Sequence, residues 1–181
     1  VDLIRTLGML DGPKSGITPP RQATDEEIET VHAPEYVAAV RQLSRTPAHA
    51  SLARMFGFGP GDNPPFEGMH EAAATIVGGA LTAAEGILQG TFEHAFHPSG
   101  GLHHAMRAQA SGFCIYNDVA VACAFFRQKR LRVLYVDGDA HHGDGVQALF
   151  YDTPEVLTIS LHESGEYLFP GTGFVTETGS G

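Results

Sequence analysis

The hydrophobic positions of this chain follow helical spacing in some segments and strand-like runs in others. Helical spacing predicts helices at residues 1–10, 24–31, from Pro34 through Leu43, 71–88, 117–129 and 144–151. Short apolar runs predict buried strands at residues 132–137 and 156–161, and a weaker run predicts a short strand at 93–96. Helices that alternate with buried strands indicate an α/β fold, with a parallel sheet covered by helices on both faces.

The spacing of these elements favours one domain over residues 1–181. A chain of this length buries about 70% of its unfolded surface, and no repeat or linker interrupts it. Loops rich in Gly and Pro are expected at residues 56–65 and 97–112. The chain begins without Met in a helical pattern and stops in a Gly/Thr-rich loop, so we expect a piece of a longer protein, truncated at both ends.

Composition narrows the classes of partner. With 11 Lys and Arg against 21 Asp and Glu, the formal charge is −10, which argues against nucleic-acid and anionic-membrane surfaces. The longest apolar run, at 119–126, is too short to cross a bilayer. The two cysteines make no disulfide framework, so a cytoplasmic location is expected. The oligomeric state stays open.

The segment 135–144 carries the strongest chemical signal. An apolar strand ends in three aspartates and two histidines within residues 137–144. Open α/β sheets bind ligands at the carboxyl ends of their strands, and Asp139 and His141 can converge there on one metal ion. Asp137 and Asp144 are suited to orient imidazoles nearby. The alternative is that these aspartates cap the next helix and the histidines are ordinary loop residues.

A second signal is the tandem pair His103 and His104 in a Gly-rich loop. Two imidazoles, each backed by a carboxylate, would form an acid–base pair that operates near neutral pH. The alternative is two surface histidines. His32 and His70, in or near predicted helices, are expected at the surface or partly buried.

Five ordered motifs make the chain resemble the histone deacetylase family. They are Gly101-Leu-His-His-Ala105, Ala110-Ser-Gly-Phe-Cys-Ile-Tyr-Asn-Asp118, Val136-Asp-Gly-Asp-Ala-His-His-Gly-Asp-Gly-Val146, Ile159-Ser-Leu-His162 and Leu168-Phe-Pro-Gly-Thr-Gly173. The sequences of residues 150–154 and 157–163 are similar to those of the bacterial acetoin-utilisation branch of this family. The resemblance implies the arginase/deacetylase-like α/β fold.

The resemblance also implies catalytic roles. His104 resembles the general base that takes a proton from a metal-activated water, and His103 resembles its electrostatic or acid partner. Asp137 and Asp144 resemble the carboxylates that back His103 and His104, respectively. The implied reaction is zinc-dependent hydrolysis of the acetyl-lysine amide in proteins.

Asp139 and His141 resemble the first two ligands of the catalytic zinc, for which Fe²⁺ is the alternative ion in vivo. The family's third ligand, an aspartate, and its oxyanion tyrosine follow the point where this sequence stops. We therefore expect this chain by itself to bind zinc weakly and to be inactive.

Other matched positions resemble substrate and structural-ion sites. Gly112 and Phe113 resemble one wall of an acyl-lysine tunnel, Phe169 the facing wall, and Asp62 a rim residue that holds the substrate backbone. Two structural potassium sites are implied: the first at Asp137, Asp139, His141, Ser160 and Leu161, the second at Phe150, Thr153 and Val156.

Three rival functions remain. An acetylpolyamine amidohydrolase would use the same chemistry on a small acetylated amine. A ureohydrolase with two metal ions would want a carboxylate where Gly143 stands. A non-catalytic module would bind acyl-lysine without turnover.

Overall fold

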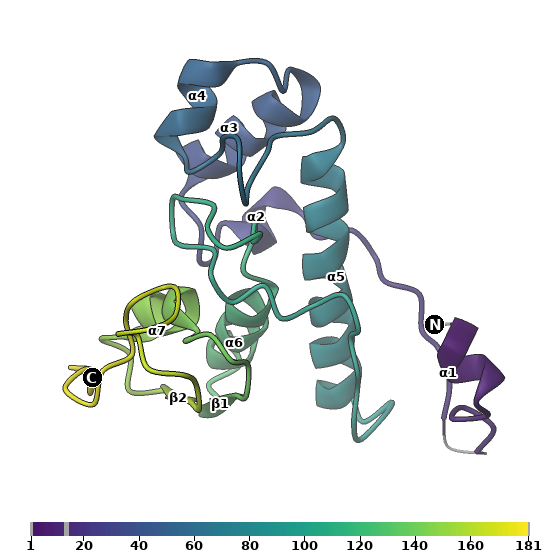
Figure 1. Cartoon of the computed structure of the whole chain (residues 1–181). Coiled ribbons are helices and arrows are strands. Elements are labelled where there is room, and N and C mark those ends of the chain that lie inside the picture. The colour runs from purple at the N-terminus through teal and green to yellow at the C-terminus, as the bar shows by residue number, and fades with distance from the viewer. Residues whose placement is uncertain (1, 13–14, 181) are drawn as a thin grey trace.

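The computed structural model describes residues 2–12 and 15–180, and Figure 1 shows the whole chain. The elements, in chain order, are α1 (Asp2–Thr6), α2 (Asp25–Ile28), α3 (Pro34–Arg45), α4 (Ala50–Met55), α5 (Met69–Leu88), α6 (Asp118–Gln128), β1 (Val133–Asp137), α7 (Asp144–Phe150) and β2 (Val156–Ser160). Val1, the first residue of the predicted 1–10 helix, lies outside the described residues, and the rest of that helix ends early, at Thr6.

β1 and β2 form a parallel pair in which Val133 lies opposite Val156 and Asp137 opposite Ser160. The crossover between them contains α7, so both strands end at the same edge. This arrangement confirms the predicted parallel sheet. It also brings the polar residues that follow β1 next to those that follow β2.

The two faces of this sheet differ. α6 and α7 contact the strands and each other, and buried Val156 lies on the covered side. On the other face, apolar side chains of both strands are exposed: Leu134 by 60%, Val136 by 57%, Leu157 by 59% and Ile159 by 41%. The described helices therefore cover only one face of the sheet, whereas the hydrophobic pattern predicted helices on both faces.

The main core lies between α3, α5 and α6 (Figure 1). Tyr36, Leu43, Val77 and Val121 are almost completely buried in it. Gly78 lets the segment before α2 approach α5 closely, because a Cβ at Gly78 would collide with the main chain at Arg21. Removing a large buried aliphatic side chain from such a core costs about 2–5 kcal/mol.

One local prediction was wrong, and one helix was not predicted. Residues 93–96 form no strand: the segment runs along α5 instead, where Phe92 packs on Gly86 and the His97 ring is within hydrogen-bond distance, 2.9 Å, of the Ile76 carbonyl. No described strand lies beside it to pair with. Conversely, the helix α4 was not predicted. It has only six residues, and its N-cap is His49 rather than a usual capping residue.

α5 is long and apolar enough, by length and composition alone, to cross a membrane. The core helix of a globular protein has the same properties. Here Met69, Ala74, Val77 and Leu81 of α5 are buried in the hydrophobic core, so packing against α3 and α6 explains the composition of this helix.

Candidate active site

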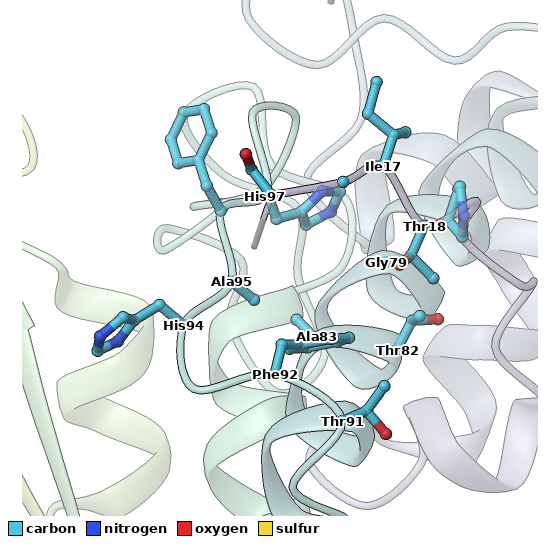
Figure 2. Close-up of a pocket in the computed structure, with 14 residues that line it drawn as sticks. Ile17, Thr18, Gly79, Thr82, Ala83, Thr91, Phe92, His94, Ala95 and His97 are labelled. Atoms are coloured by element: carbon cyan, nitrogen blue, oxygen red, sulfur yellow. The ribbon is translucent and has the colours of Figure 1, made fainter. Parts of the chain in front are cut away.

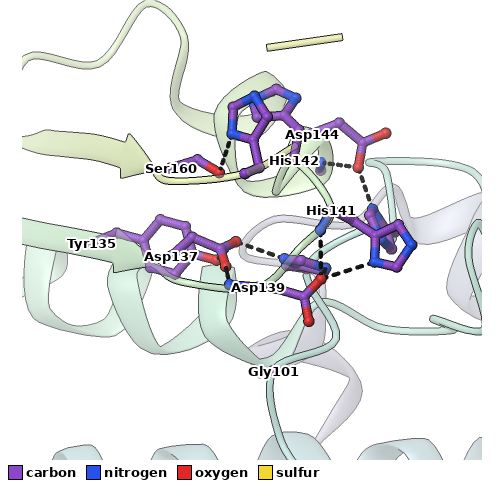
Figure 3. A network of polar contacts seen from close by, with 12 residues as sticks. Gly101, Tyr135, Asp137, Asp139, His141, His142, Asp144 and Ser160 are labelled. Carbon is purple, nitrogen blue, oxygen red and sulfur yellow. Dashed lines mark hydrogen bonds and ion pairs between the residues drawn. The ribbon is translucent and has the colours of Figure 1, made fainter. Parts of the chain in front are cut away.

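Two buried His–Asp pairs lie just beyond the carboxyl end of β1 (Figure 3). Nδ1 of His103 donates to Oδ2 of Asp137 at 2.6 Å, and Nδ1 of His104 donates to Oδ1 of Asp144 at 2.7 Å. All four side chains are between 6 and 9% exposed. The sequence-based prediction that each histidine has its own carboxylate therefore agrees with the geometry of the fold.

The carboxylate of Asp137 has further partners. Its Oδ2 accepts from the Tyr135 hydroxyl at 2.5 Å, and its Oδ1 accepts from the main-chain N–H of Asp139 at 3.0 Å. Burial opposes ionisation, but the hydrogen bonds from His103 and Tyr135 outweigh it and lower the pKa of Asp137 to about 2. Burial likewise opposes a charge on His103, yet its bond to Asp137 raises the pKa of His103. The pair thus favours a charged imidazole beside a charged carboxylate.

Asp139 and His141 form a third, more open pair. Oδ1 of Asp139 accepts from the main-chain N–H of His141 at 2.7 Å and lies 2.9 Å from its ring Nδ1. The two side chains are 52% and 42% exposed. The hydrogen bond from the His141 main chain is the main reason why the pKa of Asp139 is lowered.

A carboxylate oxygen and an imidazole nitrogen this close can bind one ion, and this donor set suits zinc or iron(II). The Asp139–His141 pair therefore fits part of the predicted metal site. Within residues 2–12 and 15–180, no group of three His, Cys, Asp or Glu side chains is placed to complete it. Nε2 of His103 is 4.0 Å from Oδ1 of Asp139, so the candidate metal pair directly adjoins the His–Asp pairs.

Aromatic rings and a glycine enclose His104. Its ring centroid lies 4.1 Å from that of His103, 5.8 Å from that of His141 and 4.9 Å from that of Phe169. Gly112, with a φ of +50°, touches the same place, since a Cβ there would meet the His104 ring at 2.5 Å and Phe169 at 3.0 Å. Only glycine fits this close approach. Gly112 and Phe169 thus lie together against the candidate base.

Two predicted substrate residues lie further out. Phe113 is 75% exposed, and its backbone has a φ of +68°. Asp62 is exposed in the 56–65 loop, and no interaction joins its side chain to the His–Asp pairs in the part of the chain that the structure describes. Their roles at a tunnel wall and rim stay predictions.

The predicted potassium positions lie in two turns at the sheet. The main-chain N–H of Leu161 donates to the Asp137 carbonyl at 2.9 Å, so the predicted members of the first site are neighbours. At the second, Thr153 N–H donates to the Phe150 carbonyl and Val156 N–H to the Thr153 carbonyl. Each of these carbonyl oxygens has a second lone pair. Potassium binding at both places stays a prediction.

Sequence reasoning missed two features that support the site. Tyr135 lies two residues before Asp137 and therefore on the same side of β1, a strand periodicity that could have revealed their contact. His142 lies 2.8 Å from Oγ1 of Thr172 and 2.9 Å from the Gln147 amide oxygen, and Gln147 donates to Glu177. This chain of contacts ties the segment that carries Phe169 to α7.

The buried histidines were also mispredicted. His32 is 0% and His70 2% exposed, although both were expected at the surface or only partly buried. Each ring is buried because the fold supplies a hydrogen-bond partner: Met106 O for His32 and the Tyr116 hydroxyl for His70.

Burial raises the pKa of Cys114 to about 11, so this thiol, next to Phe113, is a poor nucleophile at neutral pH.

A cavity with a volume of about 610 Å³ lies away from these residues. Figure 2 shows it between α5, at Thr82 and Ala83, and the 91–97 segment. Residues 15–18 and Pro20 of the N-terminal segment also line it. The cavity contains none of the His–Asp pairs, so its size does not mark the site.

Comparisons with known proteins agree with the motifs. The histone deacetylase domain model matches residues 1–181. The acetoin utilization protein AcuC of Bacillus subtilis is 50% identical over 181 residues, which are 99% of this chain and 46% of that protein. The AcuC protein of Staphylococcus xylosus is 44% identical, with 99% of this chain and 46% of that protein covered.

Solved structures give the same fold. The crystal structure of a histone deacetylase homologue from Aquifex aeolicus superposes with a TM-score of 0.88 at 38% identity, covering 99% of this chain and 49% of that one. A second structure of such a homologue, complexed with SAHA, matches equally well. The chain spans about half the length of these relatives. By its sequence over residues 1–181 and by its arginase/deacetylase-like fold, the chain belongs to the histone deacetylase family.

Proposed function

We propose that the protein is a metal-dependent deacetylase that hydrolyses the amide of N-acetyl-lysine side chains in proteins. One observation carries the proposal: two buried His–Asp pairs adjoin the open Asp139–His141 pair. Acid–base groups and candidate metal ligands thus share one site, an arrangement suited to hydrolysis of an unactivated amide.

Asp139 and His141 would hold the ion, zinc or iron(II), together with ligands from outside the described residues. When bound, such an ion polarises the amide carbonyl and lowers the pKa of a coordinated water to about 7. Both side chains are about half exposed, which leaves them accessible to an ion and to substrate.

His104 would accept a proton from the attacking water. It faces Gly112 and Phe169, while Asp144 holds its Nδ1 and leaves Nε2 on the side away from that carboxylate. His103, with the raised pKa that Asp137 gives it, would supply positive charge beside the reacting carbonyl and a proton for the leaving amine. Water and amide would thus become acetate and a free amine.

The ring of Phe169 and the bare main chain of Gly112 would form a narrow apolar approach to His104. Acylation removes the charge of a lysine side chain, so its apolar stem suits such a slot. The similar homologue whose structure is complexed with SAHA supports a ligand-binding site in this fold.

The test is hydrolysis of an acetyl-lysine peptide by the whole protein and by its His104→Ala variant. We expect kcat to fall by roughly 10²–10⁴-fold, since positioned general bases contribute about that much. The matched control is His94→Ala, an exposed histidine outside the site, which should keep wild-type kcat. A wild-type kcat in His104→Ala would overturn the assigned role of His104.

The same preparation separates the rival functions. An acetylated polyamine assayed beside the peptide shows which substrate has the higher kcat/KM. A metal count near one per chain supports the deacetylase, whereas two bound ions would favour the ureohydrolase scheme. Peptide binding without any turnover would identify a binding module.

A further inference from the structure

The loop that carries His103 and His104 has little regular structure, yet buried side chains bind its main chain on both sides of the two histidines. On the N-terminal side, the carboxylate of Asp118 accepts from the main-chain N–H of Gly101 at 3.1 Å and of Leu102 at 2.8 Å. Asp118 is only 2% exposed, and burial raises its pKa in spite of these bonds. The turn before His103 is therefore tied to the first residue of α6.

Asn117, the N-cap of α6, binds the centre of the loop. Its Nδ2 donates to the carbonyl of His103 at 3.2 Å and to that of Ala105 at 3.1 Å. Its Oδ1 accepts from the Ala120 N–H at 2.9 Å, which caps the helix. With 0% exposure, this one side chain both starts α6 and holds the carbonyls on each side of His104.

His32, which lies between α2 and α3, completes the contacts. Nδ1 of His32 donates to the Met106 carbonyl at 3.0 Å, and its Nε2 accepts from the main-chain N–H of Asn117 at 2.9 Å. Its ring packs between Tyr36 and Tyr116, with centroids 5.5 and 5.4 Å away. One ring therefore links the end of the loop to the start of α6.

α7 closes the opposite side. A Cβ on Gly145 would lie 2.5 Å from the carbonyl oxygens of both His103 and Ala105, so only glycine lets α7 approach this closely. Asp144, the residue before it, is the partner of His104. The loop is thus confined between the N-terminal ends of α6 and α7.

We propose that His32, Asn117 and Asp118 form a positioning frame that fixes the main chain of residues 101–106 and thereby aims the two imidazoles at their carboxylates. The side-chain hydrogen bonds given above for these three residues all go to main-chain groups, so they are positioning residues and act through the loop. Adjacent side chains diverge in regular structure, and a fixed irregular backbone is what allows both rings to lie 4.1 Å apart over one site. The consequence for turnover rests on the proposed function.

The test compares Asn117→Ser with Ser44→Ala in the whole, metal-loaded protein. Serine keeps a side-chain oxygen for the N-cap but, with a single O–H on a shorter side chain, cannot replace both bonds to the His103 and Ala105 carbonyls. Ser44 is the matched control, because it is buried and accepts from the His70 main-chain N–H at 3.2 Å, away from the loop. Asp118→Asn is a second variant that keeps shape and one acceptor oxygen, and it takes over if Asn117→Ser does not fold.

Two readouts are needed. Amide hydrogen exchange of residues 100–106 should speed up by about tenfold in Asn117→Ser, as expected when two hydrogen bonds are lost, and should stay unchanged in Ser44→Ala. On the acetyl-lysine peptide, kcat should fall by about tenfold with KM unchanged, because misdirected imidazoles affect the reacting state more than binding.

Equal exchange in Asn117→Ser and Ser44→Ala, or equal changes of kcat and KM in both, would overturn the frame. The exchange experiment requires no substrate. If the wild-type protein has no deacetylase turnover but the loop responds as expected, the frame stands and the proposed function fails.

Discussion

The two His–Asp pairs and the Asp139–His141 pair are neighbours, but they differ in how far this chain completes them. The His–Asp pairs are buried, and each imidazole has a dedicated carboxylate at 2.6 or 2.7 Å. Asp139 and His141 are about half exposed and bind mainly each other. The described residues therefore complete the two His–Asp pairs, to which we assign the acid–base role, and leave the proposed ion-binding pair open to further groups.

Removal of Asp139 should have the largest effect, because it breaks the open pair. Loss of a group that merely orients a ligand costs about 10–100-fold in metal affinity, so we expect Asp139→Asn to lose more than about 100-fold. Titration of the whole protein with zinc and with Fe²⁺ measures this affinity. Asp62→Asn, an exposed carboxylate outside the pair, is the control and should bind the ion normally. Unchanged affinity in Asp139→Asn would show that the open pair is not the metal site.

Acid should destabilise the buried region through His32. Burial lowers the pKa of His32 from 6.5 to about 4. Between pH 6.5 and pH 4 the unfolded chain takes up a proton that the folded chain does not. The free energy of unfolding therefore keeps its full value above pH 6.5 and decreases as the pH falls toward 4. The loss approaches about 3 kcal/mol.

Denaturant unfolding at several pH values, for wild type and His32→Gln, measures this loss. Glutamine does not titrate, so the variant should have a flatter profile between pH 6.5 and 4, even if it is less stable at pH 7. Parallel profiles for the two proteins would rule out His32 as the group responsible.

Asp144→Asn tests the buried His104–Asp144 pair separately from the open Asp139–His141 pair. A hydrogen bond to a charged group is worth about 1.5–3 kcal/mol, so kcat should fall by about 10–100-fold while metal affinity stays near wild type. Asp11→Asn, an exposed carboxylate, serves as control. A large loss of metal in Asp144→Asn would mean that the two regions are not separable.

Phe169→Leu should have the smallest effect. The ring contacts His104 edge to face, a contact worth about 0.5–1.5 kcal/mol, so KM for the acetyl-lysine peptide should rise by about 2–10-fold with little change in kcat. Phe174→Leu alters a partly exposed ring of the same segment and should not change KM. Equal KM in both variants would remove Phe169 from the substrate path.

The sequence predicted well what depends on local pattern or on motif order. The strand ending at Asp137 and the helix from Asp144 follow from residues close together in the chain, whereas the pairing of His103 and His104 with separate carboxylates, 34 and 40 residues away, was implied by the ordered family motifs. His32 was mispredicted because its burial depends on Met106 and on the start of α6, far along the sequence. The prediction of a strand at 93–96 was wrong for a related reason: the packing of this segment on α5 outweighed its weak local preference for a strand.

The crossover between β1 and β2 has a consequence for the order of folding. Val133 pairs with Val156, 23 residues further along the chain, whereas the His103–Asp137 and His104–Asp144 contacts span 34 and 40 residues. Local contacts close at a lower entropic cost, so we expect the β1–α7–β2 unit to form before the histidine loop docks on it. Substitutions at the His–Asp pairs should then speed unfolding and leave the folding rate almost unchanged, which kinetic φ-values near zero would reveal.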